Sequence, residues 1–358
     1  MDLIELLKAT VHNGASDLHI TVGVPPIIRV DGAIKPVTPD APKITPDISK
    51  AMIYSILNDL QKREFEEKWD LDFSIGVSKV GRFRVNIHLQ RGTVAGAFRY
   101  ISSEIKTLQE LGLPEILGTL ALKQKGLILV TGATGSGKST TLASMLDLIN
   151  STYSSHIITI EDPIEYLHHH KKSVVEQREI GEDSKSFPDA LRHVLRQDPD
   201  IILIGELRDL DTIASALTAA ETGHLVLTTL HTNDVVQTID RIIDVFPPYQ
   251  QQQVRVQLAS VIQGIICQQL VPRITGNGRV VATEVLIATP AVRALIRENK
   301  GHQIYSVLET GRALKMQTMD HALSELYNRR TISKSELLSR TVKPDVVEKL
   351  TRISYIKD

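Results

Sequence analysis

The chain has 358 residues, and its apolar fraction of 42% is enough for the cores of two or three compact domains. Lys and Arg (41) nearly balance Asp and Glu (42), which argues against a one-sign surface that collects nucleic acid or anionic membrane. The single cysteine, Cys267, excludes an internal disulfide and a Cys-x-x-Cys zinc site, so we expect a small apolar core residue. The N-terminus lacks signal-peptide features and no apolar run approaches bilayer length, which predicts a cytoplasmic protein.

Residues 1–105 predict an α+β domain. Apolar residues at helical spacing precede Gly14, and the segment DLHITVGVPPIIRVDG predicts two strands joined at a Pro-Pro turn. We expect a helix around residues 47–64, then a hairpin formed by GRFRVNIHLQRG and TVAGAFRYI. Strict alternation in its first strand separates an apolar face from a basic, polar one. The apolar face comprises Phe83, Val85, Ile87 and Leu89.

From residue 126 the pattern changes to short apolar runs that alternate with helical patterns. The runs LILVT, HIITIE, DIILIGE and HLVLTTLH are typical of strands buried on both faces of a parallel sheet. We therefore predict a linker at 106–125, a doubly wound α/β domain at 126–270 and a helical region at 271–358.

The segment GATGSGKS matches the phosphate-loop pattern G-x-x-x-x-G-K-[ST], between a predicted strand and a predicted helix. Its glycines allow backbone N–H groups to surround phosphate oxygens at a helix N-terminus. Lys138 would reach the β and γ phosphates of ATP, and the Ser139 hydroxyl would bind Mg²⁺. The predicted nucleotide-binding residues are Gly132, Ala133, Thr134, Gly135, Ser136, Gly137, Lys138, Ser139 and Thr140.

Hydrolysis also needs carboxylates, and two acidic segments qualify. One is IITIEDPIE, which contains Glu165; the other is DPDIILIGELRD, in which a buried strand runs into Gly205 and Glu206. The alternative is that such acids only cap the following helix, as we expect for Asp209. Gly205 stands where phosphate-loop enzymes usually carry a magnesium-binding aspartate. Glu206 would then act on the metal through water, which leaves Ser139 as its direct protein ligand.

Six segments in this order carry a resemblance over nearly the whole chain: SDLHI, GATGSGKST, TIEDPIE, DPDIILIGELRD, TAAETGHLVLTTLHT and AVRALIRE. Together they resemble the PilT family of type IV pilus retraction ATPases, within the secretion-ATPase superfamily. The resemblance implies a PAS-like N-terminal α+β domain, then a RecA-like doubly wound phosphate-loop ATPase domain with a helical C-terminal extension.

The resemblance also implies roles for individual residues. Glu165 would activate or orient water, Glu206 would be the acid of the modified Walker B strand, and His224 and His231 would sense the nucleotide. A structural, hydrogen-bonded role remains open for His224. Seven residues separate the histidines, so we expect them at opposite ends of one strand rather than as a metal pair. Residues 291–298 match the family's retraction motif and predict an amphipathic helix that packs through Val292, Leu295 and Ile296.

The family forms homohexamers with ATP between subunits, so N-terminal arginines could reach phosphate across an interface. The candidates are Arg82, Arg84, Arg91 and Arg99, and a solvated strand face is the alternative for each. The implied protein is a ring motor that powers pilus retraction and twitching motility at the inner face of the cytoplasmic membrane. Its implied partners are an inner-membrane platform protein and a second retraction ATPase, with no nucleic acid.

The sequence also bears on three rival functions. The extension and secretion ATPases of the superfamily carry a four-cysteine zinc site, which one cysteine excludes. A DNA-transfer ATPase fits the balanced charge poorly, and a PilU-like accessory ATPase remains an alternative. The polar run that contains His168, His169 and His170 has no counterpart we expect in the family. We predict an exposed loop there rather than a metal site, because adjacent histidines converge poorly on one ion.

Overall fold

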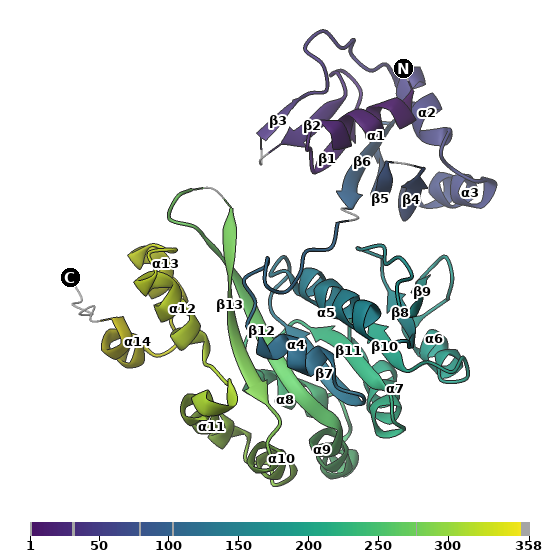
Figure 1. The fold of residues 1–358 in the computed structure, drawn as a ribbon. Helices are drawn as coiled ribbons and strands as arrows, with labels where there is room; N and C mark the ends of the chain where they lie inside the picture. The colour runs from purple at the N-terminus through teal and green to yellow at the C-terminus, as the bar shows by residue number, and fades with distance from the viewer. Residues whose placement is uncertain (1, 31–32, 79, 102–103, 277, 352–358) are drawn as a thin grey trace. The chain divides into compact units, whose positions relative to one another are not determined.

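The structure is a computed structural model that describes residues 2–30, 33–78, 80–101, 104–276 and 278–351. The chain divides into two compact units, whose helices and strands are labelled in Figure 1. The N-terminal unit runs to Glu104 and also includes Pro163–Leu167. The second unit holds Ile105–Asp162 and the chain from His168 onward.

The N-terminal unit is built on an antiparallel six-stranded sheet. Its strand order is β3 (Ala33–Pro36), β2 (Ile27–Val30), β1 (Asp17–Ile20), β6 (Thr93–Ile101), β5 (Gly81–Gln90), β4 (Asp70–Val77). The predicted hairpin is β5–β6, and its turn places Arg91 and Gly92 at positive φ. Phe83, Val85 and Ile87 are fully buried, as predicted, whereas Leu89 is 38% exposed at the end of the strand.

The helix expected around residues 47–64 is in fact two helices. After α1 (Leu3–His12), the unit contains α2 (Pro46–Tyr54) and α3 (Asp59–Lys68). The Asn58 side chain accepts a hydrogen bond from Gln61 N, and the Gln61 side chain accepts one from Asn58 N. This reciprocal capping box begins a new helix, because it satisfies backbone donors that a continuous helix would pair internally.

The second unit contains a seven-stranded sheet. Its order is β13 (Arg279–Ile287), β12 (Ile262–Pro272), β7 (Gly126–Thr131), β11 (Leu225–Leu230), β10 (Ile201–Ile204), β8 (His156–Glu161), β9 (Val174–Glu179). Neighbouring strands pair parallel except for β12 and β13. Every residue of β7, β10 and β11 is buried, so the predicted parallel sheet is confirmed.

Helices cover both faces of this sheet, in the doubly wound arrangement predicted (Figure 1). One face packs against α4 (Ile116–Ala121) and α5 (Lys138–Thr152). The other packs against α6 (Phe187–Val194), α7 (Leu210–Glu221), α8 (Val235–Asp244), α9 (Pro248–Val261), α10 (Pro290–Arg297) and α11 (Ile304–Thr310). Two short 3₁₀ helices, Gly301–Gln303 and Gly311–Leu314, flank α11.

Two predicted regions differ from the structure. Residues 106–125 were expected to be a linker, but Leu113, Leu117 and Leu120 are buried in the same core as α5. Residues 271–358 were expected to be helical, but the antiparallel strand β13 comes first. Its run of β-branched residues, RVVATEVLI, favours a strand. The helices α12 (Met319–Asn328), α13 (Lys334–Arg340) and α14 (Pro344–Thr351) then share a small core with Val271 and Ala282.

Two further predictions are confirmed by burial. Cys267 on β12 is fully buried, and burial raises the pKa of its thiol, which suits an inert core residue. Helix α10 packs through Val292, Leu295 and Ile296, as its periodicity predicts.

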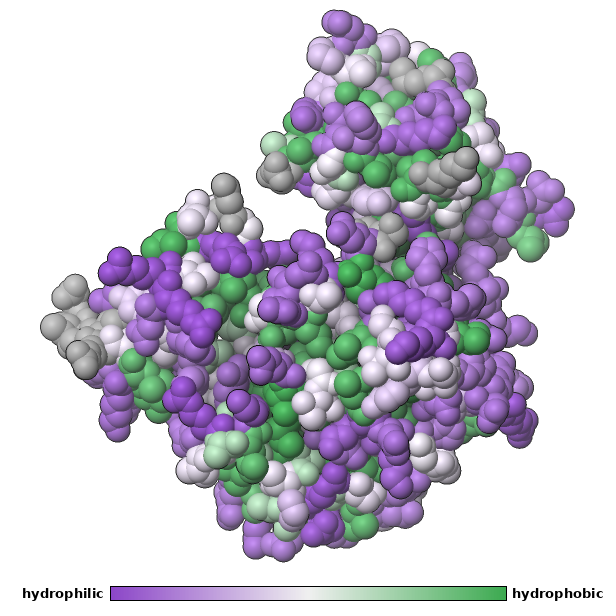
Figure 2. Space-filling model, viewed as in Figure 1, coloured by the Kyte–Doolittle hydropathy of each residue, from purple (hydrophilic) through white to green (hydrophobic). Residues whose placement is uncertain are grey.

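Across the parts of the chain that the structure describes, no helix combines the length and apolar character needed to cross a membrane. On the face of the second unit drawn in Figure 2, hydrophilic residues are interspersed with smaller hydrophobic areas.

Candidate active site

The phosphate loop joins buried strand β7 to helix α5, as predicted. Gly132, Gly135 and Gly137 have φ values of 144°, 77° and 89°, which only glycine adopts readily. A Cβ on Gly132 would lie 2.4 Å from the backbone oxygen of Gln268, so this position also lacks space for a side chain. Both the conformation and the packing of the loop therefore require glycine.

Lys138 turns back into the loop. Its Nζ donates to the backbone oxygens of Gly132 (2.9 Å) and Ala133 (3.2 Å), and the residue is only 9% exposed. A buried ammonium beside backbone amides at the start of a helix makes an anion site. The Ser136 hydroxyl is buried in the same loop and has no hydrogen-bond partner among the residues that the structure describes, which fits a loop that receives a further polar group.

A second group of side chains meets at the same edge of the sheet. Strands β7, β11 and β10 are parallel neighbours, so their carboxyl ends lie together, with Glu206 just beyond β10 and His231 directly after β11. His231 Nε2 lies 3.1 Å from Glu206 Oε1, and His231 Nδ1 lies 3.5 Å from Lys138 Nζ. Because an ammonium only donates, Nδ1 must accept, and Nε2 therefore carries the hydrogen that faces Glu206. Lys138, His231 and Glu206 form one polar chain.

Arg208 extends this chain to the other acidic segment. Its Nε donates to Glu206 Oε2 at 2.8 Å, and its Nη1 lies 3.8 Å from Asp162 Oδ2. The sequence analysis did not include Arg208 among the site residues. The sequence did contain a signal for it. Arg208 comes two residues after the strand-end carboxylate of Glu206, and its side chain can fold back onto that carboxylate where the chain turns away from the sheet. Arg208 therefore adds a side-chain link between the two predicted acidic segments, whose strands β8 and β10 are already paired.

Gly205 occupies the strand-end position as predicted, with its carbonyl accepting a hydrogen bond from Thr229 Oγ1 at 2.7 Å. Asp209 caps α7 by accepting from Thr212 N, which confirms its capping role. Ser139 lies in the first turn of α5 and is partly exposed, so its hydroxyl suits a ligand to Mg²⁺. Thr140 follows it, also partly exposed. The exposed tip of the loop comprises Ala133, Thr134 and Gly135.

His224 is at the opposite end of β11 from His231, as predicted. Its Nδ1 lies 2.9 Å from the backbone oxygen of Ala219 and 3.2 Å from Thr222 Oγ1, at the C-terminus of α7. These contacts fit the structural alternative, and a nucleotide-sensing role for His224 stays a prediction.

The remaining predicted residues belong to the N-terminal unit. Glu165 is exposed, in the segment Pro163–Leu167. Arg99 Nε pairs with Asp17 at 2.9 Å, and Arg82 donates to the Ser74 hydroxyl, whereas Arg84, beside Arg99 in the sheet, is exposed. Their roles in catalysis stay predictions.

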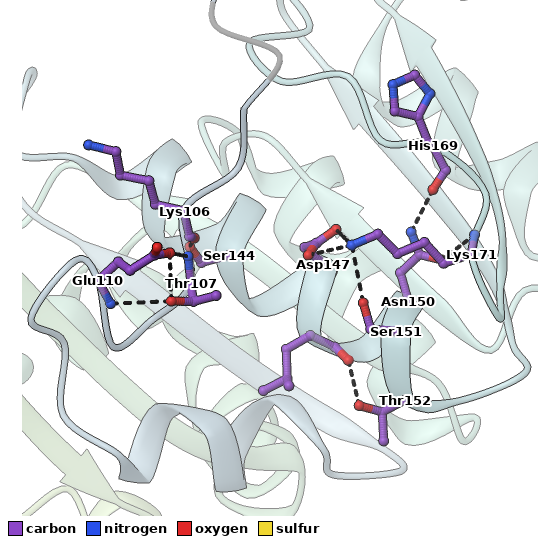
Figure 3. A network of polar contacts seen from close by, with 11 residues as sticks. Lys106, Thr107, Glu110, Ser144, Asp147, Asn150, Ser151, Thr152, His169 and Lys171 are labelled. Atoms are coloured by element: carbon purple, nitrogen blue, oxygen red, sulfur yellow. Dashed lines mark hydrogen bonds and ion pairs between the residues drawn. The ribbon is translucent and has the colours of Figure 1, made fainter.

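The segment with three adjacent histidines is a loop, exposed from His169 to Lys172 as predicted, and its backbone is held by the neighbouring helix α5. Figure 3 shows the side chain of Asn150 on α5 meeting the His169 carbonyl and Lys171 N, while Lys171 Nζ pairs with Asp147. On the same helix, Ser144 donates to the Lys106 carbonyl. His168 is largely buried, and this burial lowers its pKa to about 4; His169 and His170 are exposed. Within the described ranges, no group of three or more His, Cys, Asp or Glu side chains could hold a metal ion.

Comparisons with known proteins place this chain in a family. The family model for type II/IV secretion system proteins matches residues 2–352. The chain is 49% identical to the type IV pilus retraction ATPase PilT of Pseudomonas aeruginosa, over 96% of this chain and 99% of that protein. It is 43% identical to the type IV pilus ATPase PilU of the same organism, over 95% of this chain and 88% of that protein. A crystal structure of the pilus retraction motor PilT with bound ADP superimposes with a TM-score of 0.92, at 50% identity, over 98% of this chain and 99% of that one. The chain belongs to the type II/IV secretion system protein family.

Proposed function

We propose that this chain is the ATP-hydrolysing motor of type IV pilus retraction. The observation that carries the proposal is the polar chain Lys138–His231–Glu206–Arg208, which joins the phosphate loop to the ends of two neighbouring strands. Similarity over nearly the full length to a retraction ATPase, and to a retraction motor with bound ADP, supports the biological role.

The residues divide the chemistry between them. The loop amides and Lys138 bind the β and γ phosphates, which orients the nucleotide at the N-terminus of α5. Bound Mg²⁺ would neutralise charge on the phosphates, and Ser139 would hold it directly, with Glu206 placed to contact its water. Because Glu206 holds His231 and Arg208 on its two oxygens, its position depends on both partners. Glu165 would orient the attacking water.

Assembly completes the proposal. A homohexamer would bind ATP between subunits, and an arginine from the neighbouring N-terminal unit would approach the γ phosphate. Arg84 and Arg91, both exposed, are the better candidates, since Arg99 is paired with Asp17 and Arg82 is bound to Ser74. The proposed domains are the N-terminal unit and the ATPase core, and the work of the ring would act on an inner-membrane platform protein from the cytoplasmic side.

A PilU-like accessory ATPase is the second candidate, favoured by the 43% identity to PilU. Deletion in the parent organism separates the two. Loss of twitching motility with an excess of surface pili supports retraction, and unchanged motility contradicts it. Complementation with Lys138→Ala should fail, while the exposed Lys125→Ala should restore motility. A purified wild-type protein that releases no phosphate from ATP would favour the accessory role.

A further inference from the structure

A buried amide lies directly behind the phosphate loop. Gln268 is on β12, which runs parallel to β7, and the residue is 1% exposed. Its Nε2 donates to the Ser136 carbonyl at 2.8 Å, and its Oε1 accepts from Thr141 Oγ1 at 3.0 Å. One side chain therefore contacts both the loop and the first turns of α5.

The orientation of this amide follows from its partners. The Ser136 carbonyl can only accept, so the nitrogen of Gln268 must face it. Its oxygen is then left to accept from the Thr141 hydroxyl. With both ends paired, rotation of the amide would break two buried hydrogen bonds at once.

The contact with Ser136 bears on phosphate binding through the geometry of one peptide unit. In a trans peptide the carbonyl of one residue and the N–H of the next point in opposite directions. Holding the Ser136 carbonyl toward β12 therefore directs the Gly137 N–H away from β12, toward the interior of the loop. Gly137 has a φ of 89° and no side chain, so the steric preferences of this residue restrain the peptide only weakly.

The surroundings indicate that Gln268 is there for its polar contacts. Ile266, two residues earlier on β12, packs in the apolar core beneath α5 with Leu142 and Met145. Alternation along the strand would place another apolar residue at 268. A buried amide at a core-facing position is costly unless both of its ends are paired, as they are here.

We infer that Gln268 is a positioning residue for nucleotide binding, which fixes the Ser136–Gly137 peptide so that its N–H group receives a phosphate oxygen. The inference rests on the nucleotide site proposed above. It extends that site to a strand that the phosphate-loop motif does not include.

The test compares purified Gln268→Met and Gln268→Glu with the matched control Gln269→Met, which changes the next residue on the opposite face of β12. Gln268→Met keeps the length of the side chain without its hydrogen bonds. We expect its Kd for fluorescent ADP, and its KM for ATP, to rise about three- to tenfold, the loss of one ordinary hydrogen bond. Gln268→Glu should bind more weakly still, since a carboxylate oxygen would face the Ser136 carbonyl.

A pH series separates positioning from a merely structural role. In Gln268→Glu a protonated carboxyl group could donate to the Ser136 carbonyl again, so affinity for ADP should recover as the pH falls from 8 toward about 6, relative to Gln268→Met. A purely structural role would lower the Tm of both variants and leave the Kd at temperatures well below Tm unchanged. Equal Kd values for both variants and the control would overturn the inference.

Thr141→Val keeps the test decisive if the Gln268 variants do not fold. It removes the partner that orients the amide and leaves Gln268 in place, so a smaller rise in the Kd for ADP is expected. An unchanged Kd in Thr141→Val would then contradict the inference. Failure of the proposed function is seen separately, as absence of ATP turnover or ADP binding in the unmodified protein.

Discussion

Replacing Glu206 by glutamine tests the polar chain at its centre. Glu206 binds His231 through one oxygen (3.1 Å) and Arg208 through the other (2.8 Å), and its side chain is 20% exposed. A glutamine can accept from only one of these donors, and its NH₂ group would face the other. A hydrogen bond to a charged group contributes about 1.5–3 kcal/mol, and the share of Arg208 lies at the low end because this side chain is 60% exposed.

Losing one bond and weakening the other gives about 2–3 kcal/mol. If this falls on the transition state, turnover drops ~30- to ~200-fold, since each 1.36 kcal/mol is a factor of ten. Phosphate release at saturating Mg·ATP measures it, with the exposed Glu182→Gln as control. ADP affinity should stay within about threefold, because the loop and Lys138 remain. Turnover above a third of the parent rate would refute the role of Glu206, and joint loss of binding and turnover would indicate a collapsed loop.

Three further predictions concern the phosphate loop, helix α10 and strand β13. Gly132→Ala should abolish ADP binding in a titration, since its Cβ would lie 2.4 Å from the backbone oxygen of Gln268, at a φ of 144°. The control is Gly76→Ala, which has open space around its Cβ. Retained affinity for ADP in Gly132→Ala would show that the loop can shift. Arg293 donates to the Ala259 and Ser260 carbonyls at the C-terminus of α9. Arg293→Ala should therefore lower the free energy of unfolding by about 2 kcal/mol in urea titrations. An unchanged urea midpoint would contradict this. Buried Glu284 accepts hydrogen bonds from Val235 N and Met319 N, and its burial raises its pKa above 4.5. Its contribution to the stability of the fold is therefore complete below pH 4.5 and declines as the pH rises through the raised pKa. Glu284→Gln should remove this decline, and parallel pH–stability curves for parent and variant would contradict it.

Short-range patterns predicted much of the architecture. Short runs of mostly apolar residues identified the parallel strands, because a strand covered on both faces needs no polar side. The phosphate loop was equally readable, since its function depends on glycines and a lysine within one segment of chain. The break between α2 and α3 was also encoded locally, in Asn58 and Gln61, and was missed.

Errors arose where a local pattern had more than one tertiary use. The region at 106–125 resembles a linker by composition, yet its leucines are buried beside α5. Strand β13 lies beyond residue 270, where we expect the α/β domain to end. It still belongs to the sheet, because it pairs with β12, which follows the four apolar runs. Neither sheet pairing nor core membership is expressed within a window of ten residues.

The sequence by itself determined that this chain carries a phosphate loop between a strand and a helix, and a strand-end carboxylate at Glu206. Tertiary structure alone decided which side chains meet there. Gln268 contacts Ser136 from 132 residues away, and Lys138 and His231 are 93 residues apart. Asp17 lies on another strand, 82 residues before Arg99 in the sequence, and forms an ion pair with it. This ion pair distinguishes Arg99 from Arg84, its neighbour in the sheet. The physical reason is that parallel strands bring their carboxyl ends together only once the sheet order is set, and that order depends on packing along the whole chain.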